Sequence, residues 1–183
     1  PFMPTVLITG GAGFIGSHTA KLAHRTGWSV RVLDNLSTGL ESTFQSLADM
    51  GIDVIQGDLR DSLIIDEAVL GCDAIINLAA QISVPFSMEH PEENHAINVE
   101  GTNRLIEAAK RHNVSRLITA SSAAVYGAND AFPLIEDDAG DYHSPYAESK
   151  WLNEKEILAA REKGMESVAL RFFNVYGSGK EQM

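Results

Sequence analysis

The fold is indicated most directly by the segment Val6-Leu7-Ile8-Thr9-Gly10-Gly11-Ala12-Gly13-Phe14-Ile15-Gly16. Residues 6–9 are typical of a buried strand, and residues 14–26 are typical of a helix. Between them, Gly10 permits a tight turn, Gly13 lets the backbone approach a pyrophosphate, and Gly16 lets the helix pack closely on the sheet. The first N–H groups of the helix, near Phe14 and Ile15, would attract the phosphates. The segment therefore predicts a dinucleotide-binding turn. A P-loop is excluded, because no Gly-Lys-Ser/Thr follows.

Strand-like and helix-like segments alternate along the rest of the chain. Further β-rich runs lie at 30–33, 53–55, 74–78, 116–120 and 167–172, and helices are predicted through 65–69, at 92–112 and at 146–163. Such alternation, with near-continuously apolar strands, predicts an α/β protein with a parallel sheet covered on both faces. Right-handed crossovers give a doubly wound sheet with ligands at the carboxyl ends of its strands. The one long loop, 127–144, is of a length that is more often functional than idle.

Charge and hydropathy exclude some classes of protein. The 183 residues are 44% hydrophobic and 21% charged, as in an ordinary globular domain. The net charge of −11 argues against a nucleic-acid-binding protein, which normally presents a basic face. No apolar run approaches the roughly 20 residues of a membrane span. Residues 1–4 also lack the layout of a signal peptide.

Cysteine and histidine usage favours a cytoplasmic protein without a metal site. Cys72 is the single cysteine, so an internal disulfide is impossible, which suits a reducing compartment. Because Cys72 precedes an apolar strand, we expect a small core residue rather than a reactive thiol. Metal-like grouping is absent from the histidines considered, which are His90, His95, His112 and His143.

Asp34 ends the second predicted strand, 24 residues beyond Gly10. A carboxylate at this position can accept both hydroxyls of an adenosine ribose. No Arg or Lys occurs in residues 35–39, so a 2′-phosphate would meet a negative charge without a partner. The position therefore favours NAD over NADP. The alternative is that Asp34 only caps a turn.

Tyr146 and Lys150 lie four residues apart on a predicted helix, a spacing that places both side chains on one face. A lysine ammonium near a phenol lowers a pKa that starts near 10. The pair can then supply a base for a sugar hydroxyl. Ser122 ends the fifth predicted strand, at the edge of the sheet where ligands bind. The alternative is a surface lysine above a core tyrosine.

These residues together resemble the extended short-chain dehydrogenase/reductase family, and within it the NAD-dependent epimerases of UDP-sugars. The resemblance runs from about residue 4 to residue 177. The matching segments are 9–16, 34–39, 57–59, 77–80, 98–102, 121–127, 146–150 and 171–177. The set is specific in its order and spacing. It implies a Rossmann-like domain over residues 1–183 and a C-terminal substrate domain that is absent.

The resemblance also implies which residues hold NAD and the substrate. The implied cofactor-binding residues are Gly10, Gly13, Phe14, Ile15, Gly16, Asp34, Asn35, Ser37, Thr38, Gly39, Asp58, Leu59, Leu78, Ala79, Ala80, Gln81, Asn98, Tyr146, Lys150 and Phe173. Among them, Asp58 and Leu59 flank the adenine, and Asn98 and Phe173 lie near the nicotinamide. The implied contacts to a UDP-sugar are Ser83, Ser122, Tyr146 and Asn174.

Ala123 and Ala124 narrow the chemistry within this family. Related dehydratases carry Asp and Glu at these positions, and related decarboxylases carry Glu at the second. The remaining chemistry is hydride removal and return, with catalytic Ser122, Tyr146 and Lys150. Tyr146 would take the proton of the sugar 4-hydroxyl, Lys150 would hold the nicotinamide ribose, and Ser122 would hydrogen-bond the 4-keto oxygen.

Two alternatives remain open. One is another enzyme on the same scaffold, such as a nucleotide-sugar 4-reductase or an epimerase acting elsewhere on the sugar. The other is an NAD-binding module without turnover of its own. The resemblance further implies a homodimer through the helices near 92–112 and 146–163. Trp151 and Leu152 would lie at that interface, or would be ordinary core residues.

Overall fold

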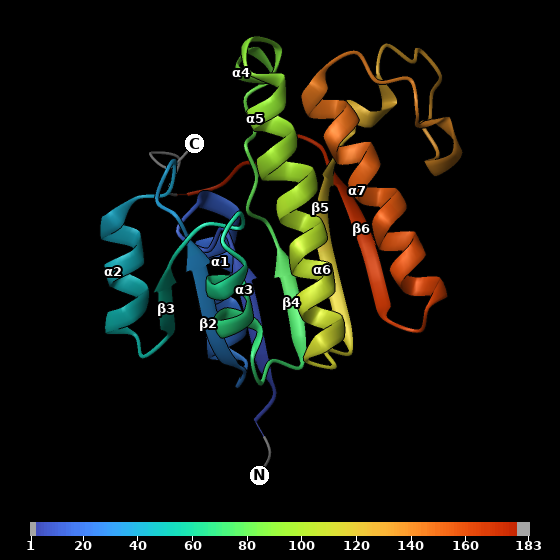
Figure 1. The fold of residues 1–183 in the computed structure, drawn as a ribbon. Helices are drawn as coiled ribbons and strands as arrows, with labels where there is room; N and C mark the ends of the chain where they lie inside the picture. The colour runs from blue at the N-terminus through green and yellow to red at the C-terminus, as the bar shows by residue number, and fades with distance from the viewer. Residues whose placement is uncertain (1–2, 179–183) are drawn as a thin grey trace.

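The computed structural model describes residues 3–178 and contains one parallel sheet (Figure 1). Its strands are β1 (Thr5–Thr9), β2 (Ser29–Asp34), β3 (Asp53–Gln56), β4 (Ala74–Asn77), β5 (Arg116–Ser122) and β6 (Glu166–Phe172). The strand order is β3-β2-β1-β4-β5-β6, and every neighbouring pair is parallel. The order reverses between β1 and β4, which confirms the predicted doubly wound sheet.

Helices cover the sheet on both sides (Figure 1). One face carries α1 (Phe14–Arg25) and α2 (Glu41–Asp49), and the other carries α3 (Ser62–Val69), α6 (Gly101–Arg111) and α7 (Pro145–Glu162). The shorter elements are α4 (Val84–Glu89), α5 (Pro91–His95), the π-helical turn η1 (Ala96–Glu100) and the 3-10 helices η2 (Ala123–Tyr126) and η3 (Glu136–Asp138).

The helix predicted at 92–112 is confirmed as a continuous run of α5, η1 and α6, interrupted only by its π-helical turn. The helices α2 and α4 were not expected. In α4, Ser83 is the N-cap, and its Oγ accepts from the Phe86 N–H at 3.2 Å. Pro85 in the first turn adds a second start signal. The expectation that residues 177–183 form no final element lies mostly outside the described residues.

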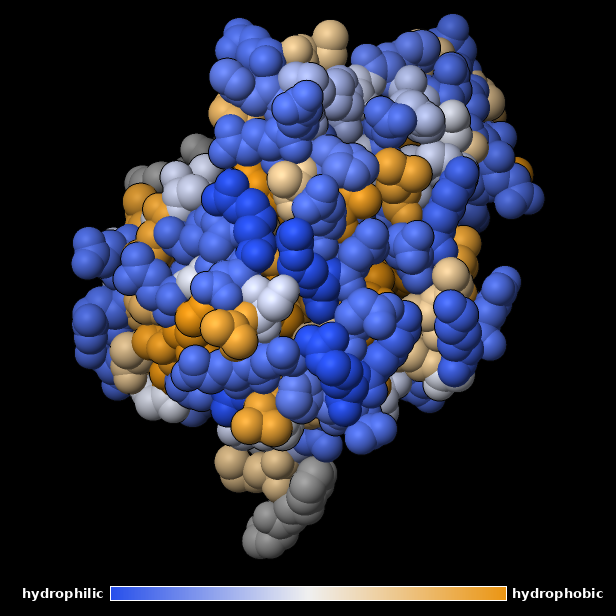
Figure 2. Space-filling model, viewed as in Figure 1, coloured by the Kyte–Doolittle hydropathy of each residue, from blue (hydrophilic) through white to orange (hydrophobic). Residues whose placement is uncertain are grey.

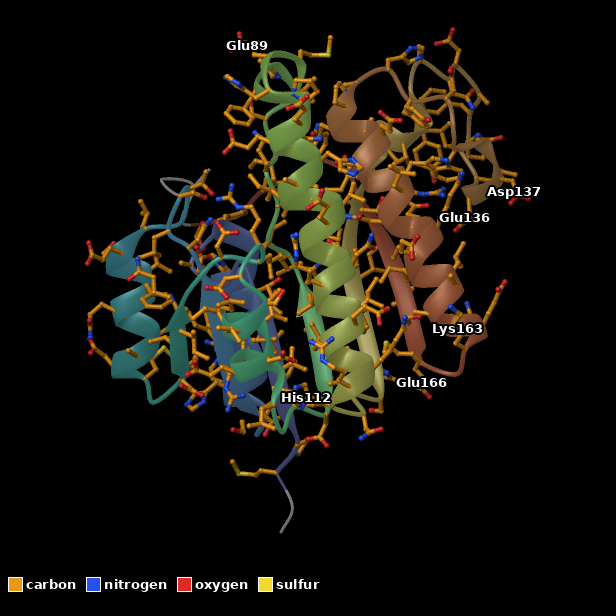
Figure 3. The ribbon with its side chains drawn as sticks, viewed as in Figure 1. Glu89, His112, Glu136, Asp137, Lys163 and Glu166 are labelled. Carbon is orange, nitrogen blue, oxygen red and sulfur yellow. The ribbon has the colours of Figure 1, made fainter. Side chains whose placement is uncertain are left out.

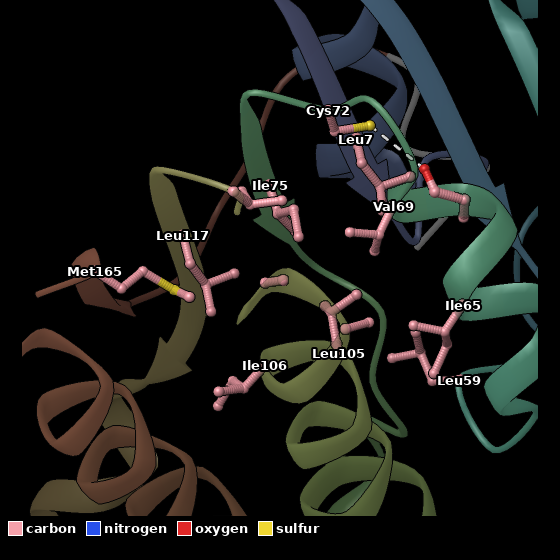
Figure 4. Close-up of a cluster of buried hydrophobic side chains, with 14 of the residues drawn as sticks. Leu7, Leu59, Ile65, Val69, Cys72, Ile75, Leu105, Ile106, Leu117 and Met165 are labelled. Atoms are coloured by element: carbon pink, nitrogen blue, oxygen red, sulfur yellow. Dashed lines mark hydrogen bonds between the residues drawn. The ribbon is translucent and has the colours of Figure 1, made fainter. Parts of the chain in front are cut away.

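Alternate residues of the strands point into two separate cores, as the two-residue period of a strand requires. Leu7 and Leu105 are buried between the sheet and α3, α6 and α7, whereas Ile8 and Leu47 are buried beneath α1 and α2. Figure 4 shows the first of these cores. Cys72 belongs to it at 5% exposure, and its thiol donates to the Ala68 carbonyl at 3.4 Å. Burial raises the pKa of this thiol, so the prediction of a core cysteine is confirmed.

The face beneath α1 is covered unevenly across the sheet. The row of residues in register from β1 to β6 runs from Ile8 through Ile76 and Ile118 to Val168. Ile8 is fully buried, whereas Val168 is 43% exposed and the neighbouring Leu170 is 42% exposed. The opposite face is a mixture of hydrophilic side chains and apolar patches (Figure 2). Within residues 3–178, no helix is long and apolar enough to cross a membrane.

Replacing Leu105 with Ala tests the main core. Leu105 is fully buried between α6 and the sheet, so the change removes apolar contacts and leaves a cavity. We expect the free energy of unfolding to fall by about 2–5 kcal/mol, measured by urea denaturation. The matched control is Leu63→Ala, because Leu63 lies on α3 and is 80% exposed. It should change stability by less than about 0.5 kcal/mol. Equal effects of both substitutions would contradict this assignment of the core.

Candidate active site

The glycine turn between β1 and α1 leaves no room for side chains. Gly10 has a φ of 68°, and a Cβ there would lie 2.7 Å from the Ala79 nitrogen. A Cβ on Gly16 would lie 2.1 Å from the Gly10 carbonyl oxygen. The N-cap of α1 is Gly13, with no side-chain cap and no acidic residue in the first turn. The start of α1 therefore offers backbone N–H groups and partial positive charge to an anion such as a pyrophosphate.

Near the carboxyl edge of the sheet, the rows of apolar side chains across the strands are followed by a row of buried polar side chains. Thr9, Asn77 and Thr119 lie in register on β1, β4 and β5. Thr9 Oγ1 donates to Asn77 Oδ1 at 2.6 Å and accepts from the Ala79 N–H at 3.2 Å. Asn77 Nδ2 donates to the hydroxyls of Thr102 and Thr119 at 3.2 and 3.5 Å. These bonds hold the start of segment 78–81, predicted to line the cofactor pocket, against the glycine turn.

Asp34 lies at the end of β2, beside the glycine turn, and is 8% exposed. Its Oδ2 accepts from the Ala12 N–H at 2.9 Å and its Oδ1 from the Leu36 N–H at 2.8 Å. Leu36 adopts a φ of 59°, which is rare for a residue with a side chain. The carboxylate therefore does cap a turn, as the alternative held. Each oxygen keeps a further lone pair, so the ribose contact stays a prediction that this geometry permits.

Asn35 and Asp58 meet at the same edge, next to Asp34. Asn35 Nδ2 donates to Asp58 Oδ2 at 2.9 Å, and Asn35 Oδ1 accepts from the Ser37 N–H at 3.0 Å. Arg60 donates two hydrogen bonds to Asp58, from Nε to Oδ1 at 2.9 Å and from Nη2 to Oδ2 at 2.8 Å. These bonds from Arg60 hold the pKa of Asp58 well below its usual range. Arg60 was not predicted as a site residue, although it stands only two residues after Asp58 in the sequence.

Asn98 lies in η1 and is 1% exposed. Its Oδ1 accepts from the Gln81 N–H at 2.8 Å, and its Nδ2 donates to the Gln81 carbonyl at 2.9 Å. The same Nδ2 contacts Asn94 Oδ1 and Ser149 Oγ, both at 3.1 Å. The side chain therefore fastens Gln81 to α7. Its predicted place near the nicotinamide stays a prediction.

The first turn of α7 is held by side chains from two elements. Ser144 Oγ accepts from the Ala147 N–H at 3.1 Å and caps the helix. Ser87, fully buried in α4, accepts from the Tyr146 N–H at 3.2 Å. Asn94 donates to the Pro145 carbonyl at 3.0 Å. Ser87 and Asn94 were not predicted from the sequence, because these contacts join residues 59 and 51 positions apart.

The structure brings Ser122, Tyr146 and Lys150 together at the ends of β5 and α7. Burial raises the pKa of Tyr146, and a hydrogen bond with Ser122 opposes this rise. Lys150 Nζ lies 5.8 Å from the Tyr146 ring centroid and donates to the Ala120 carbonyl at 3.1 Å. Burial lowers the pKa of Lys150 to about 8. The expected lowering of the Tyr146 pKa is therefore wrong: the pKa is raised, because burial dominates. The idea of a surface lysine is also wrong, since Lys150 is 5% exposed.

The segment after β6 returns across the carboxyl edge toward the glycine turn. Phe173 is 60% exposed, and its ring centroid lies 6.1 Å from that of Tyr126. Asn174 is also exposed. A Cβ on Gly177 would lie 3.5 Å from the Phe14 ring. The predicted nicotinamide and diphosphate residues thus lie on a segment that joins both halves of the edge.

A pocket of about 380 Å³ opens at the start of α7, where Ala147, the sequence neighbour of Tyr146, is one of its lining residues. Its lining residues are Val84, Ala124, Gly127, Ala128, His143, Ser144 and Ala147. Four of these come from segment 127–144, the predicted long loop. In the described part of the chain, no three His, Cys, Asp or Glu side chains are grouped to hold a metal. His143 lies 3.3 Å from Asp141, and His112 lies 3.1 Å from Asp66, which also pairs with Arg111 at 2.7 Å.

Comparison with known proteins agrees with this geometry. Residues 6–183 match the NAD dependent epimerase/dehydratase family. A UDP-glucose 4-epimerase of Lactobacillus helveticus is 36% identical over 180 residues, covering 96% of this chain and 53% of that protein. The chain spans about half the length of the curated relatives it matches.

Solved structures of similar fold carry the ligands that the residues suggest. A UDP-glucose 4-epimerase of Brucella ovis in complex with NAD has a TM-score of 0.85 and 37% identity, with 93% of this chain and 52% of that chain covered. A UDP-N-acetylglucosamine 4-epimerase of Methanobrevibacter ruminantium, in complex with UDP-N-acetylmuramic acid, has a TM-score of 0.89 and 34% identity. That match covers 97% of this chain and 57% of that one. The chain therefore belongs to the NAD dependent epimerase/dehydratase family.

Proposed function

We propose that the protein is an NAD-dependent epimerase that inverts C4 of a UDP-hexose through a 4-keto intermediate. The proposal rests on Ser122, Tyr146 and Lys150, which lie together at the carboxyl edge of the sheet. These residues offer one base and one hydrogen-bonding hydroxyl. Ala123 and Ala124, which directly follow Ser122 in the sequence, stand where an elimination would need carboxylates. The similarity to UDP-sugar 4-epimerases supports the same reaction. The proposal concerns the whole protein, since the chain spans about half the length of those relatives.

The residues of the chain fit NAD. The glycine turn forms a cradle that a Cβ at Gly10 or Gly16 would fill, and the start of α1 would hold the pyrophosphate. Asp34 would accept hydrogen bonds from the ribose hydroxyls. Its negative charge would disfavour a 2′-phosphate, because no lysine or arginine lies in residues 35–39 to offset it. Asn35 and Asp58 lie beside it to receive the adenosine end. When bound, NAD supplies a reversible acceptor for the hydride of the sugar C4.

Tyr146 would take the proton of the 4-hydroxyl and return it after the ketose has turned in the site. Burial raises the pKa of Tyr146, so this residue needs positive charge nearby to act as a base. Lys150 can provide that charge, because its Nζ lies 5.8 Å from the Tyr146 ring centroid. Ser122, already bonded to Tyr146, would donate to the 4-keto oxygen.

A homodimer through α6 and α7 is part of the proposal. On α7, Trp151 and Leu152 are both partly exposed. A second copy packed on this face would cover both side chains. Cytoplasmic placement also stays a prediction, which rests on the single buried Cys72.

Tyr146→Phe tests the catalytic assignment. The change removes the proposed base but keeps the ring, so UDP-galactose turnover should become undetectable while the NAD dissociation constant stays within about threefold. Turnover would be measured for this chain and for the longest form encoded by its gene, and NAD binding by calorimetry. The control Tyr142→Phe alters an exposed hydroxyl and should keep activity. Retained turnover in Tyr146→Phe would exclude the mechanism. NAD binding without turnover in the unaltered long form would favour a non-catalytic module.

Product analysis separates the remaining enzyme classes. Incubation with several UDP- and GDP-sugars should give interconversion at C4 without net consumption of NAD. A reductase would instead consume a reduced cofactor, and an epimerase of another carbon would give a different stereoisomer.

Asp34→Asn tests the choice of cofactor. The substitution keeps the shape of the side chain but removes its charge and one acceptor. We expect NAD affinity to fall about tenfold, which corresponds to about 1.4 kcal/mol, and NADP affinity to stay equal or rise. Asp137→Asn, an exposed change on η3, should leave both affinities unaltered. An equal loss for both dinucleotides would mean that Asp34 acts only through the turn.

Leu152→Glu tests the dimer. A charge at the proposed interface should raise the dimer dissociation constant by at least about tenfold, or about 1.4 kcal/mol. Light scattering behind a sizing column would measure this. Leu158→Glu is the matched control, because Leu158 is 55% exposed and lies on a different side of α7. If both variants stay dimeric, α7 is not at the interface.

A further inference from the structure

A buried ion pair lies behind the proposed catalytic residues. Glu154 follows Lys150 by four residues on the same face of α7 and is 6% exposed. Arg171 on β6 donates a hydrogen bond to each carboxylate oxygen of Glu154, from Nε to Oε1 at 2.9 Å and from Nη2 to Oε2 at 2.7 Å. This bond to Glu154 raises the pKa of Arg171 above its ordinary value. Charges are costly to bury unless they are paired in such good geometry.

The remaining donor of Arg171 reaches two other elements. Nη1 donates to the Tyr126 hydroxyl at 3.0 Å and to the Glu136 carbonyl at 2.7 Å. The guanidinium carbon also lies 4.9 Å from the Tyr126 ring centroid and 6.0 Å from that of Trp151. The planar guanidinium fork of Arg171 therefore links α7, the end of η2 and segment 127–144. Figure 3 shows Glu136 on this segment, beside α7.

The parts held by this pair are Ser121 and segment 127–144, which lines the pocket at the start of α7. Ser121 Oγ donates to Glu154 Oε1, and Ser121 directly precedes Ser122. Segment 127–144 supplies four of the pocket's lining residues, including His143 and Ser144. The segment is fastened near its far end, where the Gly140 N–H donates to the Val125 carbonyl at 2.9 Å.

We propose that the Arg171–Glu154 pair is a positioning element, whose fork holds Ser122 and segment 127–144 in place around Tyr146. That these groups form an active site rests on the proposed function, whereas the contacts themselves do not. The proposal requires Arg and not merely a positive charge. A lysine has one compact ammonium, which cannot reach Glu154, Tyr126 Oη and the Glu136 carbonyl together.

A second ion pair on the same strands provides a control. Arg116 on β5 and Glu166 on β6 pair at the opposite end of the sheet, with side chains 59% and 68% exposed. Figure 3 shows Glu166 at the end of β6 that lies away from Glu136 and segment 127–144. Arg116 and Glu166 contact neither segment 127–144 nor Ser121 in any hydrogen bond given by the structure. Arg116→Lys therefore makes the same chemical change at a site without the proposed role.

The test is hydrogen exchange with mass spectrometry on the 183-residue chain, with Arg171→Lys, Arg171→Met and Arg116→Lys. In Arg171→Lys, the amides of Asp138 and Gly140, which are hydrogen-bonded in the structure, should exchange at least tenfold faster. Exchange of the amides of β1 and β4 should increase much less than exchange of Asp138 and Gly140. Arg171→Met should loosen the same segment at least as much, and Arg116→Lys should change neither region.

Two results would overturn the proposal. One is a lysine variant with full protection of Asp138 and Gly140, since a single charge would then suffice. The other is faster exchange spread equally over β1, β4 and the segment, which marks a general stabilising pair. If Arg171→Met does not fold, Arg171→Lys and Tyr126→Phe still decide, because Tyr126→Phe removes only one acceptor. These experiments need no substrate, so they remain decisive if the protein proves not to be an epimerase.

Discussion

The hydrogen bonds among Thr9, Asn77 and Thr119 are the constraint on which the rest of the site depends. Below this row the strands bury apolar side chains, and above it the backbone of β1 and β4 leaves the sheet toward the cofactor region. Buried polar groups are costly unless they are bonded, so this row allows only one alignment of β1, β4 and β5. The same alignment brings Gly10 within reach of Ala79, where a side chain would collide. The cradle for a dinucleotide is therefore a result of how the core ends.

Charge is distributed in this edge so that each ionised group has a different task. Asp58 is kept ionised by Arg60, and Glu154 is matched by Arg171, so both carboxylates are neutralised locally. Lys150 is the exception, because its ammonium meets a backbone carbonyl rather than a carboxylate. That arrangement leaves its positive charge uncompensated beside Tyr146. Whether Tyr146 can act as a base therefore depends on the charged groups beside it, because burial alone raises its pKa.

The extent to which sequence predicted the structure follows from the range of the interactions concerned. All of the predicted strands and the helix carrying Tyr146 are confirmed, because periodicity and glycine spacing are local signals. Asn98 was placed correctly on its helix, but its bonds to Gln81 and Ser149 depend on the packing of three separate elements. The helix α2 has only Thr43 and Leu47 buried, too short a pattern to identify. The pKa of Tyr146 was misjudged because burial cannot be read from a four-residue spacing.

The uneven covering of the sheet has a consequence for how this chain behaves among its own copies. β6 is the last strand in the order, so its outer backbone groups form an open edge next to the exposed Val168 and Leu170. Open, apolar edges are templates on which other strands can add, and natural proteins limit them with charge. Here Glu166 stands at one end of β6 and Arg171 near the other, which leaves only a short stretch between charged residues. The apolar stretch that this open edge offers to an added strand is therefore short, from Ser167 to Leu170.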